Sequence, residues 1–284
     1  MAERQRRKTG KAVLAAGLLV CACATGCSGD GVAAEDSRAA HDPVRTVRQV
    51  PDALLAAGSS QARTAMEMAA GGTRVTIRGE GVYDFRQQLG RLTLVLPQDP
   101  AGAPEHRPIT ELLAPGALFM KNRGAGVPAD KWVRVETATL SDGNLVTGGA
   151  TDPFAAAQVL RGTRTAAFVG DTRVAGVAVR HFRGTADLAL AAKNASAAGE
   201  EALKAALKAA AKGFATADVP FDVYLDDQGR VRKLRQRFSF VGGHGHDRKT
   251  VAVFSTTLLY AFGTPVSVTL PQSKDIYAGR IAER

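Results

Sequence analysis

The chain has 284 residues, a formal net charge of +10 and 45% hydrophobic residues, which is enough apolar material for one sizeable core. Its three cysteines, Cys21, Cys23 and Cys27, all lie near the start, so the remainder of the chain cannot form an internal disulfide. The basic residues are scattered and are not interleaved with aromatic residues, and we therefore expect no nucleic-acid partner.

Residues 1–26 have the pattern of an export signal. Basic residues at positions 4 to 11 precede an apolar run over residues 12–24, and small residues follow. The apolar run is shorter than the roughly 20 residues that a membrane-spanning helix requires. We therefore predict that residues 1–26 direct export and are then removed.

The end of this segment carries a second signal. Ala24-Thr25-Gly26-Cys27 resembles the bacterial lipobox, in which small residues precede a cysteine that is acylated and becomes the mature N-terminus. The resemblance implies a lipoprotein with palmitate-type chains on Cys27, anchored to the outer face of the cell membrane. Acylation at Cys23, or no cleavage at all, is the alternative.

Residues 27–47 are predicted to form a flexible tether, because they are small, polar and interrupted by proline. Removal of the signal leaves a net charge of about +6, which suits an anionic membrane or wall surface. Residues 48–284 are predicted to form one folded domain. Apolar residues at helical spacing first predict a helix over residues 49–69, ended by Gly71-Gly72.

Beyond Thr73 the apolar period changes to two, which predicts strands. The first four predicted strands are residues 75–85, 92–96, 117–121 and 131–136, with a loop over 98–108. Three more are predicted at 165–169, 172–180 and 181–188, with a turn at Gly170-Asp171. The last four are predicted at 221–225, 230–241, 251–262 and 266–270, with a hairpin turn at 226–229.

Two further helices are predicted between these strands. Asp152 is placed to cap a short helix that has Pro153 at its first position and extends to Leu160. A second helix is predicted over residues 196–212, with Ser196 as its cap and a lysine row along one face.

Consecutive strands with few helices predict an α+β domain: a single highly curved antiparallel sheet, an open half-barrel, with helices on its concave side. Three glycines in or beside the strands, Gly79, Gly81 and Gly176, are predicted to mark places where the sheet bends sharply.

Four segments in this order, at residues 127–133, 177–184, 222–230 and 262–266, resemble the actinobacterial lipoproteins of the LppX/LprG type, which share a half-barrel with the LolA and LolB lipoprotein carriers. The resemblance covers roughly residues 50–275. It implies a hydrophobic cavity between the sheet and its helices that holds acylated lipids or glycolipids.

A lipid cavity needs a continuous apolar lining, because acyl chains gain free energy by leaving water. The alternation of the strands predicts this lining to be Val75, Ile77, Leu92, Leu94, Leu96, Leu118, Met120, Val133, Val135, Phe221, Val223, Phe238, Phe240, Val251 and Val253. The alternative is that these side chains form a closed core, with no ligand, in an anchored module that binds an envelope protein.

Other residues have two interpretations each. The row Lys204, Lys208 and Lys212 suits anionic headgroups or a plain solvated helix face. Trp132 suits a cavity rim or a structural position. The loop that holds His244 and His246 is too incomplete a ligand set for us to predict a metal site.

No catalytic motif is present in the sequence. It contains no Gly-x-Ser-x-Gly, no His-Glu-x-x-His and no phosphate-binding glycine loop, and acylation would consume the thiol of Cys27. His181 is predicted to be a packed or surface residue. We therefore predict a binding protein with no enzymatic activity, no catalytic residue and no cofactor.

Overall fold

The structure is a computed structural model that describes residues 42–70, 73–97, 107–124, 126–195, 201–242 and 249–279. The chain divides into two units, residues 1–38 and 39–284, and every element below belongs to the second unit. The sheet and its core are complete within residues 39–284, so this part of the chain has what it needs to fold on its own.

Across the described residues, eleven strands form one sheet in the order β6-β5-β4-β3-β2-β1-β11-β10-β9-β8-β7, and all neighbouring strands are antiparallel. The end strands β6 and β7 do not pair with each other, so the sheet is open. The strands are β1 (Ser59–Ala70), β2 (Thr73–Asp84), β3 (Leu89–Val95), β4 (Ile109–Ala114), β5 (Ala117–Lys121), β6 (Val133–Glu136), β7 (Thr163–Val174), β8 (Val177–Asp187), β9 (Asp218–Leu225), β10 (Val231–Gly242) and β11 (Lys249–Tyr260).

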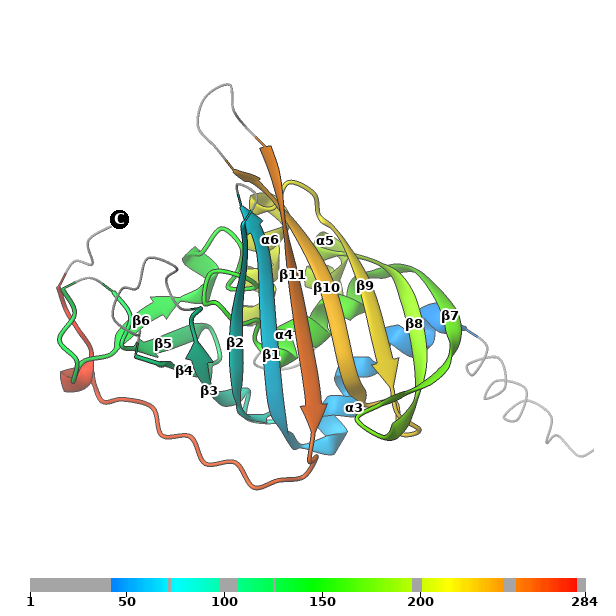
Figure 1. The fold of residues 1–284 in the computed structure, drawn as a ribbon, viewed down its shortest axis with the longest axis horizontal. Helices are drawn as coiled ribbons and strands as arrows, with labels where there is room; N and C mark the ends of the chain where they lie inside the picture. Colours follow the sequence, from blue (N-terminus) through cyan, green and yellow to red (C-terminus); the bar gives the residue numbers. More distant parts are fainter. Residues whose placement is uncertain are drawn as a thin grey trace, which may run out of the picture. The chain divides into compact units, whose positions relative to one another are not determined.

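The helices lie on one side of this curved sheet, behind the strands in Figure 1. They are α2 (Pro43–Arg48), α3 (Val50–Ala57), α4 (Pro153–Val159), α5 (Leu188–Asn194) and α6 (Glu201–Gly213), with short 3-10 turns η1 (Thr137–Thr139), η2 (Leu160–Gly162) and η3 (Ser273–Asp275). The predicted fold class, an open antiparallel half-barrel with helices on its concave side, is confirmed.

Two glycines of β2 let β3 approach closely. A Cβ atom at Gly81 would lie 1.8 Å from the main-chain oxygen of Arg91, and one at Gly79 would lie 2.5 Å from Leu94 Cδ2. Only glycine fits at such distances, so both residues allow tight β2–β3 packing inside the curve. Gly176 does not bend a strand: it lies in the β7–β8 turn with a φ of +83°.

The predicted helix over residues 49–69 was wrong in its second half. Helix α3 ends at Gly58, whose φ is +80°. Strand β1 follows, and its side chains alternate, with Ala62, Thr64 and Met66 buried. Ala62 and Met66 lie four residues apart, which fits both a helical spacing and a period of two, and pairing with β2 and β11 decides for the strand.

The region of β7 and β8 differs from the prediction as well. Two long strands replace the three short ones, and the turn lies at residues 175–176. Gly170, predicted as a turn residue, lies within β7 at a shift of the strand register. A bulge accommodates the extra residue, so the chain does not reverse there.

Three other predictions are corrected or extended. The predicted tether overlaps α2, where Asp42 accepts a hydrogen bond from the Arg45 amide and Val47 is buried. Strand β4 and helix α5 were not predicted. Residues 266–270 form no strand: the C-terminal segment runs outside the sheet over β4–β6, where Trp132 exchanges main-chain hydrogen bonds of 2.8 Å with Asp275 and Tyr277.

The predicted α4 cap is confirmed. Asp152 accepts hydrogen bonds from the amides of Phe154 and Ala155, and Pro153 is the first helical residue. The predicted hairpin at residues 226–229 is also present between β9 and β10, where buried Asp226 accepts from the amides of Gln228 and Arg230.

Candidate functional site

The concave face of the sheet is a continuous apolar surface. Of the fifteen predicted lining residues, thirteen belong to one hydrophobic cluster, either buried or packed against it. Val75 and Val251 are the exceptions: both are half-buried, and the strand register places Val75 opposite Met68 near one end of the sheet. Strand alternation therefore identified the correct face, which it can do because successive side chains point to opposite sides.

An irregular segment, residues 141–151, covers this face. We call it the inner segment. Nine of its eleven residues are buried, although none belongs to a helix or strand. Gly149 approaches Ile77 and Leu94 on the sheet, and Gly143 lies against the backbone of Ala206 in α6. The inner segment is thus enclosed between the concave face and helix α6.

The inner segment is held mainly by its own residues. The carboxylate of Asp142 accepts hydrogen bonds from the amides of Asn144, Val146 and Thr147, at 2.6–3.0 Å. Two side-chain contacts tie the segment to the strand region: Arg123 donates to the main-chain oxygens of Thr147 and Gly148, and Thr151 bonds to Ser255 at 2.6 Å. A compact loop of this kind resembles an Ω-loop more than a core element.

A lone carboxyl group lies beneath the inner segment. Glu111 points inward from β4 between Leu92 and Met120 and has no exposed surface. Burial raises the pKa of Glu111 to about 8; nearby Arg123 opposes this shift and Asp152 adds to it. The side chain is therefore mostly neutral at pH 7.

Glu111 also lacks hydrogen-bond partners. In the described part of the chain, four buried side-chain oxygens are unpartnered: both of Glu111, Oδ1 of Asn144 and Oγ of Ser60. A Cβ atom on Gly148 would lie 3.0 Å from Asn144 Oδ1 and 3.2 Å from Glu111 Oε1, so these two oxygens face the same small space. Sequence reasoning missed this pair. The signal that could have found it is Glu111, the single acid within the largely apolar run of residues 109–113.

A second buried acid is fully used by the fold. Asp152, which caps α4, accepts a hydrogen bond of 3.0 Å from the hydroxyl of Tyr83. Burial raises the pKa of Asp152, although its hydrogen bonds from Ala155, Phe154 and Tyr83 oppose the shift. Burial, together with the negative charge of Asp152, raises the pKa of Tyr83 well above its ordinary value. We assign this pair a structural role.

Helices α5 and α6 form a basic groove on the helical side. Its volume is about 550 Å³. Its floor is alanine, and four lysines surround it: Lys193 from α5 and Lys204, Lys208 and Lys212 from α6. Among the described residues, no carboxylate lines the groove, although Glu201 lies 3.7 Å from Lys204. The predicted lysine row is thus joined by a fourth lysine from α5, a helix that the sequence analysis missed.

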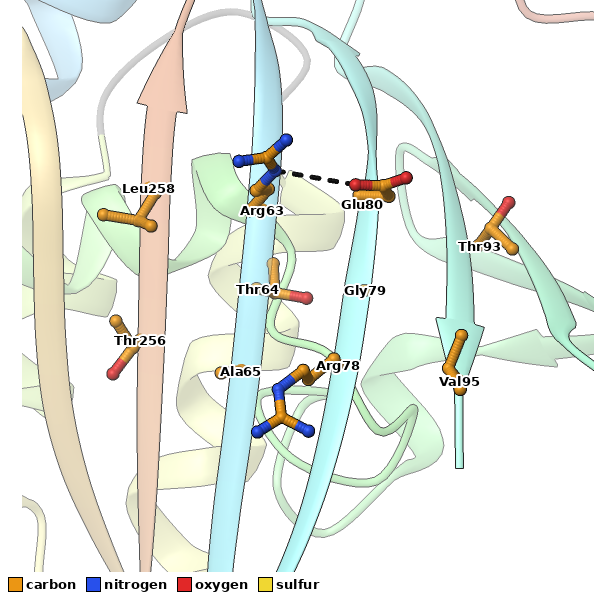
Figure 2. A pocket seen from close by; sticks show the side chains of 10 residues that line it. All are labelled: Arg63, Thr64, Ala65, Arg78, Gly79, Glu80, Thr93, Val95, Thr256 and Leu258. Carbon is orange, nitrogen blue, oxygen red and sulfur yellow. Dashed lines mark ion pairs between the residues drawn. The ribbon is translucent and has the colours of Figure 1, made fainter. Parts of the chain in front are cut away.

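The outer face of the sheet carries a different pocket, shown in Figure 2. Its volume is about 570 Å³, and it lies over β1, β2, β3 and β11. Arg63 and Glu80 form an exposed ion pair of 3.5 Å across it. Alternation placed these residues outside the core, and no site was predicted there.

Other singled-out residues are structural. Trp132 packs with Leu112 and Phe119 under the C-terminal segment, away from the concave face. His181 stacks on Tyr224 and bonds to Asp222 at 2.7 Å.

Several predictions fall on residues that the structure does not describe. The leader with Cys27, the Ser196 cap and the His244/His246 loop lie outside the described residues. Among the described residues, no cluster of three or more metal-ligating side chains is present, and no helix has the length and apolar character to span a bilayer.

No protein-family model and no curated protein matches this chain. Solved structures that match include the lipoprotein LppX of Mycobacterium tuberculosis, with a TM-score of 0.45 and 11% identity over 80% of this chain and 97% of that one. LprF from Mycobacterium bovis matches with a TM-score of 0.40 and 13% identity, over 81% and 96% of the two chains. A domain described as outer-membrane lipoprotein-sorting, from Vibrio parahaemolyticus, matches with a TM-score of 0.33 and 9% identity, over 80% and 95%.

The LppX-type and LolA-like proteins to which the sequence was compared are therefore among the folds that match. The function proposed below is argued from the geometry of this chain.

Proposed function

We propose that this protein is an extracytoplasmic lipoprotein that binds an apolar or acylated molecule on the concave face of its sheet. A tether from acylated Cys27 would hold the domain next to the membrane, where it carries or presents its ligand. The observation that supports this best is a continuous apolar face covered, in part, by an irregular segment in place of a packed helix.

The binding mechanism is passive. Each CH₂ group that leaves water contributes about 0.8 kcal/mol, so an acyl chain laid along the concave face binds without directed contacts. Admission of the chain requires the covering elements to shift, which is a change in population between a closed and an open state. No reaction is involved, and the ligand leaves as it entered.

Native mass spectrometry of residues 39–284 tests this function. We expect the purified domain to carry the extra mass of an acylated molecule, which organic extraction removes. A bare mass, with no uptake of an apolar dye, would contradict ligand binding.

Two neighbouring residues offer a matched pair for this measurement. Leu96 packs against the hydrophobic cluster of the concave face, whereas Val95 points outward and is 56% exposed. Leu96→Glu is expected to lose the extra mass, because it places a charge at the edge of the apolar face. Val95→Glu makes the same change in charge on the outer face and should retain it.

A second candidate function is an anchored module that binds another envelope protein and no lipid. The observation that favours it is that ten of the predicted lining residues are already buried in one packed cluster. The mass measurement separates the two functions, because a closed core carries no lipid.

The basic groove gives a further prediction. We propose that its four lysines face anionic phospholipid headgroups, because they surround an alanine floor that no carboxylate of the described residues lines. The triple variant Lys204→Glu, Lys208→Glu and Lys212→Glu is expected to weaken binding to vesicles containing phosphatidylglycerol by at least about a hundredfold, because each lost lysine contributes about 1 kcal/mol and each new carboxylate adds repulsion. Co-sedimentation at low and high salt measures this loss.

The matched control reverses three exposed arginines of the outer face, Arg78, Arg91 and Arg237. It makes the same change in net charge and should leave vesicle binding within a few-fold of the native value. Equal losses in both variants would mean that net charge alone attracts the domain and that the groove has no special part.

A further inference from the structure

The inner segment occupies the space in which an acyl chain would lie, and its contacts suit it to leave. It lies over Ile77, Leu94 and Leu118, all predicted lining residues. Within the described ranges, no main-chain hydrogen bond joins residues 141–151 to a strand. Its three hydrogen bonds to Asp142 would move with it, so displacement breaks few hydrogen bonds, although it exposes the buried side chains of Leu145 and Val146.

The surface beneath the inner segment is largely apolar, and its polar side chains include Ser255, which bonds to Thr151, and Glu111, which has no partner. The two oxygens of Glu111 and Oδ1 of Asn144 are buried acceptors without a donor. A buried polar group without a partner costs free energy, so such groups are normally satisfied by protein, water or ligand. Glu111 stays on β4 when the inner segment moves, so it suits a ligand that supplies a hydroxyl group.

We propose that the inner segment is a displaceable plug, and that its movement opens a site in which an acyl chain lies on the concave face while a hydroxyl group of the same ligand bonds to Glu111. This inference rests on the proposed lipid-binding function and specifies that the bound lipid carries a hydroxyl group. A ligand with a carboxylate end fits poorly, because it would bring an uncompensated charge into an apolar space.

The chemistry of Glu111 agrees with a hydroxylated ligand. The raised pKa leaves Glu111 mostly protonated at pH 7. A neutral carboxyl group both donates and accepts, which matches an alcohol. Arg123 lies outside the plug and holds it through hydrogen bonds to the main-chain oxygens of Thr147 and Gly148.

The first experiment measures binding of tritiated 1-palmitoylglycerol and of palmitic acid to residues 39–284 at pH 7. We expect at least a tenfold preference for 1-palmitoylglycerol. Glu111→Met should lose this preference, and the conservative Glu111→Gln should keep it, because the amide retains an acceptor and a donor. Equal binding of both lipids to the native domain would overturn the assignment of Glu111.

The second experiment tests the plug. Arg123→Ala removes the two bonds that hold residues 147–148, so a larger fraction of the domain is open and the apparent affinity should rise about tenfold. Arg91→Ala, which removes an exposed arginine on the outer face, should leave the affinity unchanged. An Arg123→Ala domain that binds no tighter than the native one would overturn the plug.

Hydrogen exchange provides a readout that needs no variant. The amides of Asn144, Val146 and Thr147 should exchange faster when 1-palmitoylglycerol is bound, because the segment is then displaced into solvent. Slower exchange on binding would mean that the ligand packs on an intact plug. If the native domain binds neither lipid, the proposed function fails and this inference fails with it.

Discussion

Replacing Glu111 with methionine is expected to raise the free energy of unfolding by several kcal/mol at pH 9, and by much less at pH 5. The cause is the difference between a pKa of about 8 in the folded protein and 4.5 as the ordinary value. Because the folded state holds this proton more tightly, stability falls as the pH rises through the window from about 4.5 to 8. The slope is about 1.4 kcal/mol per pH unit inside that window.

The groups that face Glu111 set the details of this prediction. Burial is the main cause of the raised pKa, Arg123 opposes it, and Asp152 adds to it. Asp152 has its own raised pKa and will leave some dependence on pH in every variant. Urea unfolding of residues 39–284 at several pH values measures the effect.

Two further variants complete the test of Glu111. Glu111→Gln stays neutral at every pH and should show a flatter stability curve than the native protein. Glu80→Gln removes an exposed acid that pairs only with Arg63, and should change stability by less than about 1 kcal/mol. If Glu111→Gln kept the native slope between pH 5 and 8, Glu111 would not be the titrating group.

Cys27→Ser is expected to abolish incorporation of radiolabelled palmitate into the full chain and to move the protein from the membrane to the soluble fraction. A single acyl chain gives only marginal membrane binding, whereas two or more on one residue give stable anchoring. Loss of the acylated cysteine therefore removes the whole anchor in one step. Labelling followed by fractionation of cells measures both effects.

The leader itself provides matched controls, because it holds two other cysteines. Cys21→Ser and Cys23→Ser should keep the label and the membrane location. Label lost in Cys23→Ser but kept in Cys27→Ser would move the acylation site to Cys23. Label kept in all three variants would contradict a cysteine anchor in this segment.

Local pattern predicted most of the sheet. Alternating apolar residues identified β2, β3 and β9–β11, and the acidic and glycine residues at 226–229 identified a hairpin, because both signals depend on residues adjacent in the chain. Strand β4 was missed for a related reason: Glu111 stands at an inward position where alternation calls for an apolar residue. Glu111, which breaks the alternation, is a fully buried acid of the concave face without a hydrogen-bond partner.

The candidate site was only half predictable. Thirteen of the fifteen predicted lining residues belong to the hydrophobic cluster on the concave face, since alternation determines which side chains share a face. The segment that covers them was not predicted, because residues 141–151 have neither a helical nor a strand period. The fourth lysine of the basic groove was also missed, because it comes from a helix of only seven residues.

The sequence by itself determined strands β2, β3 and β9–β11, the sides of these strands that face inward, and the export and acylation signals proposed for residues 1–27. The tertiary structure alone decided that an irregular segment lies over the apolar face, that Glu111 is buried without a partner, and that α5 joins α6 around a lysine groove. Burial and partnership depend on residues far apart in the chain, such as Thr151 and Ser255, which no local period can bring together.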